Sequence, residues 1–143
     1  MNHALVREIL LFEQETSLRI LVAEAEPDLR RLVGAALRRD GHDVVEARDG
    51  AELLEALAGT LVEPGASPFD LLVCEQRLPG MPGVNVLAGL RSRDRATPFV
   101  LVTEDPDIAR RARRLGAEVL FRLEVAAILA IARRVSGLTP AND

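Results

Sequence analysis

The sequence predicts an α/β fold: a doubly wound (βα)5 three-layer sandwich built on a parallel sheet, with an extra helix at the N-terminus. Short apolar runs alternate strictly with amphipathic segments along most of the chain, which is typical of repeated strand and crossover-helix units. The run at residues 71–74 is apolar without alternation, which indicates a strand buried on both faces. The length of 143 residues fits one domain.

The apolar runs are predicted to form five strands. Their shortness favours strands over helices. Helices on both sides of a parallel sheet would cover both faces of such strands. The predicted strands lie at residues 19–23, 43–47, 70–75, 99–103 and 118–121.

The segment after the first strand has the clearest helical pattern. Its apolar residues recur at intervals of three and four, which places them on one helix face, and arginines occupy the other side. Pro27 suits the first turn of a helix, and Gly41 suits the left-handed position after the last turn. We therefore expect a helix at about residues 27–40. Similar reasoning predicts helices at about residues 51–59, 83–93, 106–115 and 124–135.

The predicted domain spans residues 18–137, between an N-terminal extension (residues 1–17) and a C-terminal tail (residues 138–143). The turn-rich stretch at residues 62–68 is interpreted as a loop before the central strand. Within the extension, a pattern consistent with an amphipathic helix is formed by Leu5, Val6, Ile9, Leu10 and Phe12. Such a segment packs on its own domain or frays; alternatively, it forms a dimer contact.

Composition limits the classes of function. The formal net charge of −4 gives no global attraction to nucleic acid or anionic lipid. The single cysteine, Cys74, excludes an internal disulfide and a multi-cysteine metal site, and its apolar strand suits a buried thiol. No apolar stretch reaches the roughly 18–20 residues needed to cross a bilayer, so we expect a cytoplasmic protein that contacts neither membrane nor nucleic acid. All 18 basic residues are arginine, so the chain has no lysine.

Polar residues that can bind a ligand or take part in a reaction follow the predicted strands. In an open parallel α/β sheet, ligands bind beyond the carboxyl ends of the strands. Glu24 and Glu26 follow the first strand, Glu75 ends the third, and Thr103 and Glu104 end the fourth. Carboxylates gathered at one edge can hold a hard cation such as Mg²⁺, although acidic residues also occur in loops because loops are solvated.

Several short motifs occur in order along the chain. They are ILVAEAEP at residues 20–27, GHDVVEA at 41–47 with Asp49 and Gly50, FDLLVCE at 69–75, LPGMPG at 78–83, Thr97 and Pro98 leading into FVLVT at 99–103, and LGA at 115–117. Together they resemble the CheY-like receiver domain of bacterial response regulators, over about residues 19–135. The resemblance implies strand order 2-1-3-4-5 and transfer of phosphate, assisted by Mg²⁺, from a histidine kinase to an aspartate that ends the third strand.

Most positions that carry this family's chemistry depart from its pattern. The phosphoacceptor position falls on Glu75, whose extra methylene displaces the carboxylate, and in-line transfer tolerates little misplacement. The acidic pair after the first strand reads Glu24 and Ala25, so a metal ligand is missing unless Glu24 and Glu26 compensate together with Glu75. Mg²⁺ penalises irregular geometry, so metal binding is doubtful and no other cofactor is expected.

Two further positions complete the comparison with the family. Thr103 matches the hydroxyl that contacts the phosphoryl group, although a β-branched residue is also ordinary in a strand. The family's lysine falls on Leu123, and the neighbouring Arg122 is a bulkier cation with a different reach. Glu104, beyond Thr103, would repel a phosphoryl group.

A degenerate receiver, or pseudo-receiver, is the interpretation that follows from these departures. We expect a stand-alone, non-enzymatic two-component signalling module that acts by protein contact without phosphorylation, with Glu75 either a relic or a mimic of the phosphorylated state. One alternative is a working phosphoacceptor that uses Glu75 with Mg²⁺. A flavodoxin-like ligand binder is a third, but the chain lacks a phosphate-binding loop after the first strand.

The expected partner is a protein, such as a histidine kinase or a downstream effector, or a second copy in a homodimer. Four arginines between residues 110 and 114 form either a solvated face or a docking patch. The last helix is apolar over more than one stripe, which suggests either contact with a partner or burial beneath the N-terminal helix. The predicted partner face therefore consists of Arg110, Arg111, Arg114, Ile128, Ile131 and Val135. His3 and His42 are predicted to be neither catalysts nor ligands.

Overall fold

A computed structural model describes residues 3–4, 17–62, 68–93 and 96–137. Strands and helices alternate in it as the sequence predicts. The strands are β1 (Arg19–Ala23), β2 (Asp43–Ala47), β3 (Leu71–Glu75), β4 (Phe99–Val102) and β5 (Glu118–Leu120). The helices are α2 (Pro27–Arg39), α3 (Gly50–Val62), α4 (Gly83–Arg91), α5 (Pro106–Arg114) and α6 (Val125–Ser136).

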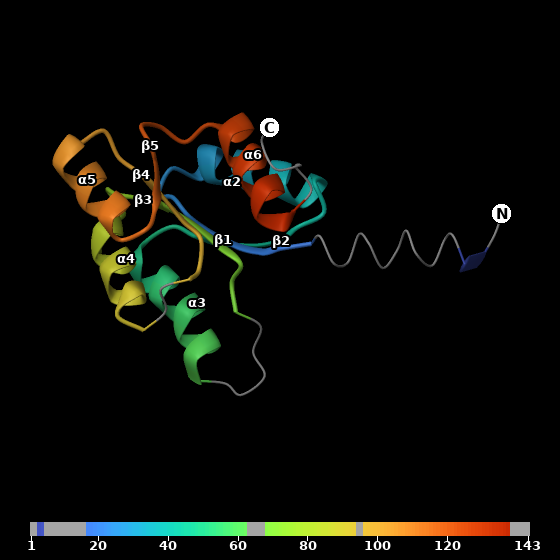
Figure 1. Cartoon of the computed structure of the whole chain (residues 1–143), viewed down its shortest axis with the longest axis horizontal. Helices are drawn as coiled ribbons and strands as arrows, with labels where there is room; N and C mark the ends of the chain where they lie inside the picture. The colour runs from blue at the N-terminus through green and yellow to red at the C-terminus, as the bar shows by residue number, and fades with distance from the viewer. Residues whose placement is uncertain (1–2, 5–16, 63–67, 94–95, 138–143) are drawn as a thin grey trace.

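The strands of the described chain form one parallel sheet in the order β2-β1-β3-β4-β5. The order confirms the doubly wound fold and the topology that the resemblance implied. The central strand β3 pairs with β1 on one side and β4 on the other, so the carboxyl ends of these three strands lie together (Figure 1). The order reverses between β1 and β3, which is the place where ligands bind in folds of this kind.

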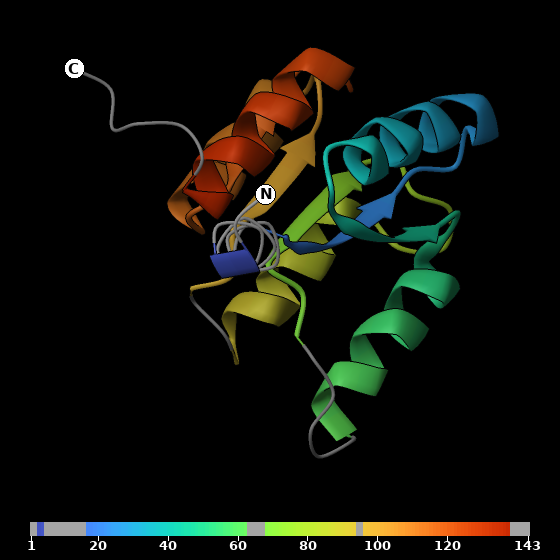
Figure 2. The same ribbon diagram turned by 90° about the vertical axis from the view of Figure 1, so that its right-hand side faces the viewer.

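Two apolar clusters fill the space on the two faces of the sheet. One cluster joins the sheet to α2 and α6, and the other joins it to α3, α4 and α5. Figure 2 shows α2 and α6 on one side of the sheet and α3 and α4 on the other. The side chains of β3 divide between the clusters because successive residues of a strand point to opposite faces: Leu72 and Cys74 belong to one, Leu71 and Val73 to the other.

The predicted partner face on α6 needs a correction. Ile128 and Ile131 are buried, at 0% and 7% exposure, in the apolar cluster that α6 shares with α2 and the sheet. Val135 is half-buried and packs against the same cluster. These side chains therefore stabilise the domain itself, and only the arginines of the predicted face are exposed.

The predicted N-terminal helix and C-terminal tail lie almost wholly outside the described residues. The turn-rich loop before β3 is also outside them, apart from its two ends at Val62 and Pro68. Among the helices that the structure describes, none is long and apolar enough to span a bilayer.

Candidate functional site

A cleft of about 670 Å³ lies beyond the carboxyl ends of the strands. It is lined by residues that end β3 and β4, by the loops that follow β1, β3 and β4, and by the segment after β5. Its lining includes Glu24, Glu75, Thr103, Glu104, Phe121, Arg122 and Leu123. The structure therefore brings most of the sequence-predicted site residues to one place.

Glu75 is the last residue of β3, and its carboxylate stays close to its own loop. Its Oε1 accepts a hydrogen bond from the backbone N–H of Arg77 at 3.3 Å. The next residue, Gln76, bonds to two neighbouring elements. Its N–H donates to the carbonyl of Val102 at 2.9 Å, and its side-chain oxygen accepts from the N–H of Val84 at 2.8 Å. The end of β3 is thus tied to β4 and to the start of α4.

Glu75 ionises in an unfavourable environment. Burial raises the pKa of its carboxyl above the ordinary value, the N–H of Arg77 opposes this, and the negative charges of Glu24 and Glu104 raise the pKa further. The site therefore already disfavours one negative charge at residue 75. A dianionic phosphoryl group placed there would meet the same carboxylates.

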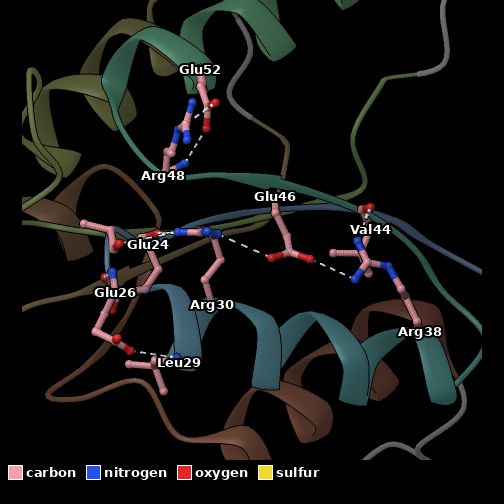
Figure 3. A network of polar contacts seen from close by, with 10 residues as sticks. Glu24, Glu26, Leu29, Arg30, Arg38, Val44, Glu46, Arg48 and Glu52 are labelled. Atoms are coloured by element: carbon pink, nitrogen blue, oxygen red, sulfur yellow. Dashed lines mark hydrogen bonds and ion pairs between the residues drawn. The ribbon is translucent and has the colours of Figure 1, made fainter.

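The two carboxylates that follow β1 diverge. Glu24 is buried at 7% exposure, lines the cleft, and accepts from the N–H of Glu26 at 3.3 Å. The side chain of Glu26 instead caps α2, accepting at 2.8 Å from the N–H of Leu29 (Figure 3). This bond satisfies a free donor at the helix N-terminus, where a negative charge is also favoured by the helix dipole.

Arg30 of α2 links the loop after β1 to β2. Arg30 Nη1 donates to the carbonyl oxygen of Glu24 at 2.9 Å, and its Nε lies 3.4 Å from Glu46 Oε1. Arg38 also pairs with Glu46, at 2.8 Å, so that one carboxylate of β2 joins two arginines of α2 (Figure 3). Because Arg30 is 11% exposed, its contacts hold the loop more firmly than a surface ion pair would.

The hydroxyl and the cation predicted from the sequence both reach the cleft. Thr103 directly follows β4 and is buried, and its Oγ1 accepts from the N–H of Asp105 at 3.2 Å. Arg122 and Leu123 both line the cleft beyond β5. Arg122 is exposed, so its guanidinium lies in solvent at the edge of the cleft.

Comparison with known proteins agrees with this architecture. A sequence model described as the response regulator receiver domain matches residues 20–121. The chain belongs to the response regulator receiver domain family. As a receiver domain it is a signalling module of two-component systems, not an enzyme.

Curated relatives of this receiver are longer proteins. The transcriptional regulatory protein TcrA of Mycobacterium tuberculosis is 34% identical over 88 residues, which are 62% of this chain and 32% of that protein. The Regulator of RpoS of Escherichia coli K12 is 32% identical over 102 residues, which are 70% of this chain and 28% of that protein. The receiver therefore spans about a third or less of the length of these relatives.

Solved receiver structures share the fold. The non-phosphorylated HemR receiver domain of Leptospira biflexa superposes with a TM-score of 0.68 at 25% identity, covering 88% of this chain and 99% of its own. The chemotaxis response regulator CheY4 of Vibrio cholerae gives 0.67 at 22% identity, covering 83% and 98%.

The residues of this receiver do not fit the divalent metal that the family uses. Ala25 offers no side-chain oxygen, and the carboxylate of Glu26 is engaged as the cap of α2. Within the described residues, no group of three or more histidine, cysteine or acidic side chains is arranged to hold a metal ion. The predicted set of Glu24, Glu26 and Glu75 is therefore not assembled, because Glu26 turns away.

Three residues have structural roles that the sequence-based predictions do not include. Arg30 holds the loop after β1, as described above. Arg91 is buried on α4 and donates to the carbonyls of Leu115 at 2.6 Å and Thr97 at 2.8 Å. His42, expected only to be inert, is buried and its Nδ1 accepts from the N–H of Leu18 at 3.0 Å. Sequence offers little signal for such roles, because arginine is usually exposed.

Proposed function

We propose that this receiver signals without phosphorylation, by contact with a protein partner. The observation that carries the proposal is the environment of Glu75. The acceptor position holds a half-buried glutamate with a raised pKa, faced by the charges of Glu24 and Glu104, and the acidic residues after β1 are not arranged to bring a metal to it.

The chemistry of phosphoryl transfer explains why this environment matters. Catalysis of that reaction depends on placing the attacking oxygen in line and on neutralising the charge of the transferred group. Glu75 carries its carboxylate one methylene further from the strand than an aspartate would. The cationic residues in the cleft lining are Arg77 and Arg122, both exposed.

A protein contact is supported by the exposed arginines of α5. Arg110, Arg111 and Arg114 are exposed, and Arg110 is paired with Asp107 on the same helix. Arg111 and Arg114 form no ion pair with any described residue. Their guanidinium groups can make bidentate contacts with carboxylates. An acidic surface on a histidine kinase, on an effector, or on a second copy of the chain fits this patch.

Intact-mass measurement tests the independence from phosphorylation. The protein is incubated with Mg²⁺ and a small acyl-phosphate donor and then weighed. We expect no added phosphate on the natural sequence. The positive control is a variant carrying Ala25→Asp, Glu75→Asp and Leu123→Lys, which restores the family's residue types at the metal, acceptor and lysine positions and should gain one phosphate.

The opposite result would support the working phosphoacceptor. A base-labile gain of one phosphate on the natural chain, mapped to Glu75, overturns the proposal. The role of the α5 patch is tested separately by sedimentation and by binding to candidate kinases, with Arg111→Glu and Arg114→Glu as the variants. Loss of association in these variants is expected, while Arg48→Glu, on the loop after β2, should leave association unchanged.

A further inference from the structure

An apolar groove lies between α3 and α4, away from the cleft at Glu75. It encloses about 520 Å³. Leucines of α3, apolar residues of α4, and residues at the start of β3 form most of its lining: Leu54, Leu57, Val86, Leu90, Phe69 and Leu72. We propose that this groove is the docking site, within the same molecule, for the apolar side of residues 5–16.

The groove exposes apolar surface that a partner would cover. Leu54 is 45% exposed, which makes it one of few large apolar side chains with such exposure in the described chain. Contiguous exposed apolar surface in a small domain usually marks a contact site. Arg93 lies at the groove and supplies a positive charge there.

The first strand, which follows the N-terminal segment, begins beside this groove. Arg19, the first residue of β1, places its guanidinium 4.8 Å from the ring centre of Phe69, which lines the groove. The same two segments exchange backbone contacts, since the N–H of Arg19 donates to Asp70 Oδ2 at 2.8 Å and the N–H of Asp70 donates to the carbonyl of Arg19 at 2.7 Å. Arg19 therefore lies next to the groove lining. The two residues before it, Ser17 and Leu18, bond to Gly41 and His42 in the turn before β2, so residues 5–16 reach the groove by crossing this edge of the sheet.

The sequence of the segment suits an apolar groove with a basic edge. Its apolar residues are Leu5, Val6, Ile9, Leu10, Leu11 and Phe12, and its acidic residues Glu8, Glu13 and Glu15 outnumber Arg7. As a helix, residues 5–16 would extend roughly 18 Å, against about 14 Å for the nine residues of α4 that form one wall. The segment is thus long enough to follow the groove and can offer a carboxylate to Arg93.

Attachment favours this occupant over a second molecule. A segment tethered next to its site has an effective concentration on the order of millimolar. A second copy, or another protein, must compete with it from solution. Occupation of the groove by a second copy would therefore contradict the proposal.

Cross-linking locates the segment. Ile9→Cys is combined with Asn85→Cys, an exposed groove residue on α4, and treated with a short bis-maleimide. The natural Cys74 does not interfere, because it is buried and burial raises the pKa of its thiol to about 12. At a protein concentration of about 10 µM, the linked product should run as a monomer and exceed that of the control pair Ile9→Cys and Arg111→Cys by roughly tenfold.

A filled groove provides a second, matched test. Gly89 lines the groove, and a β-carbon there would meet no heavy atom within 4 Å. Gly59 on α3 has the same open surroundings but does not line the groove. Gly89→Leu should expose the segment, so that trypsin cuts after Arg7 roughly fivefold faster or more than in the natural chain. Gly59→Leu should leave the rate unchanged, and circular dichroism should show both variants folded.

Each result has a defined meaning. Equal cutting rates in the Gly89→Leu and Gly59→Leu variants would overturn the proposal. So would equal cross-linking of Ile9→Cys to residues 85 and 111, or a product that runs as a dimer, which would assign the groove to a second copy. None of these outcomes depends on whether Glu75 accepts phosphate.

Discussion

The carbonyl oxygen of Glu75 lies so close to Gly83 that a β-carbon on residue 83 would stand 2.7 Å from it. The same β-carbon would stand 2.7 Å from Leu101 Cδ1 and 3.1 Å from the Cα of Gln76. Backbone atoms cannot give way as the end of a flexible side chain can. The chain therefore turns from β3 into α4 only because residue 83 has no side chain, and this turn fixes where Glu75 sits at the edge of the cleft.

Replacing this glycine should destabilise the domain. Gly83→Ala is expected to lower the free energy of unfolding by about 1–3 kcal/mol, the usual cost of forcing an extra carbon into a packed site. Urea unfolding followed by circular dichroism measures it. In the control Gly59→Ala, the new β-carbon is in open space, and removing a helical glycine should stabilise by about 0.5–1 kcal/mol. Equal effects of the two substitutions would contradict the close contact.

The charge on Glu75 should make stability depend on pH. Burial, and then the charges of Glu24 and Glu104, raise the pKa of Glu75 in the folded protein, against the opposing bond from Arg77. The folded state therefore holds this proton more tightly than the unfolded chain, so the stability contributed by the protonated group is present at low pH. It is lost as the pH rises from about 4.5, the ordinary value, through the raised pKa.

Glu75→Gln removes this titration. The variant should unfold at a higher urea concentration than the natural chain at neutral pH, and the difference should vanish below pH 4.5. Glu55→Gln, at an exposed position of α3, should change the midpoint little at either pH. A Glu75→Gln variant that is no more stable at neutral pH would show that the carboxylate is better solvated than its surroundings indicate.

The architecture was predictable because burial on two faces leaves a direct trace in the sequence. Uninterrupted apolar runs such as residues 71–74 and the intervals of three and four after Pro27 gave strand and helix ends within a few residues of the structure. Helix ends were predicted less accurately than strand ends: α3 continues to Val62, beyond the predicted end at residue 59. The apolar stripe of α6 was recognised, but its covering by α2 and the sheet depends on tertiary packing.

The types of residue that line the cleft were predicted from the sequence. Where the structure differs from that prediction, the cause is local. Glu26 was counted as a metal ligand although Pro27 at the first helical position already indicated that residue 26 is the helix cap. His42 and Arg91 gave no such signal. Their burial depends on which segments meet in three dimensions: β1 with the turn before β2 for His42, and α4 with the turn after α5 for Arg91.

His42 should make the domain less stable in mild acid. Its Nδ1 accepts from Leu18, and its Nε2 is buried with no hydrogen-bond partner among the described residues. Burial lowers the pKa of His42, against the charge of Asp40, so the unfolded chain binds this proton more readily. Stability should fall as the pH drops from 6.5, the ordinary value, through the lowered pKa of the folded state.

A non-titrating side chain tests this expectation. His42→Gln keeps an acceptor for the N–H of Leu18 and should flatten the dependence of the urea midpoint on pH between neutrality and pH 5. Arg133 lowers the pKa of Asp40 through a side-chain hydrogen bond, so Asp40 stays ionised over this interval. Parallel pH profiles for the variant and the natural chain would assign the acid sensitivity to other groups.

Arg91 should contribute more to stability than an arginine usually does. It is 8% exposed, and its donors satisfy the carbonyls of Leu115, at the end of α5, and Thr97, before β4. Arg91→Met keeps the apolar stem but leaves these acceptors without their guanidinium donor, so we expect a loss of about 2–4 kcal/mol in urea unfolding. Arg113→Met, on the exposed side of α5, should stay within about 0.5 kcal/mol of the natural chain. If the two methionine variants unfold at the same urea concentration, the buried guanidinium does not hold α4 to the turn that follows α5.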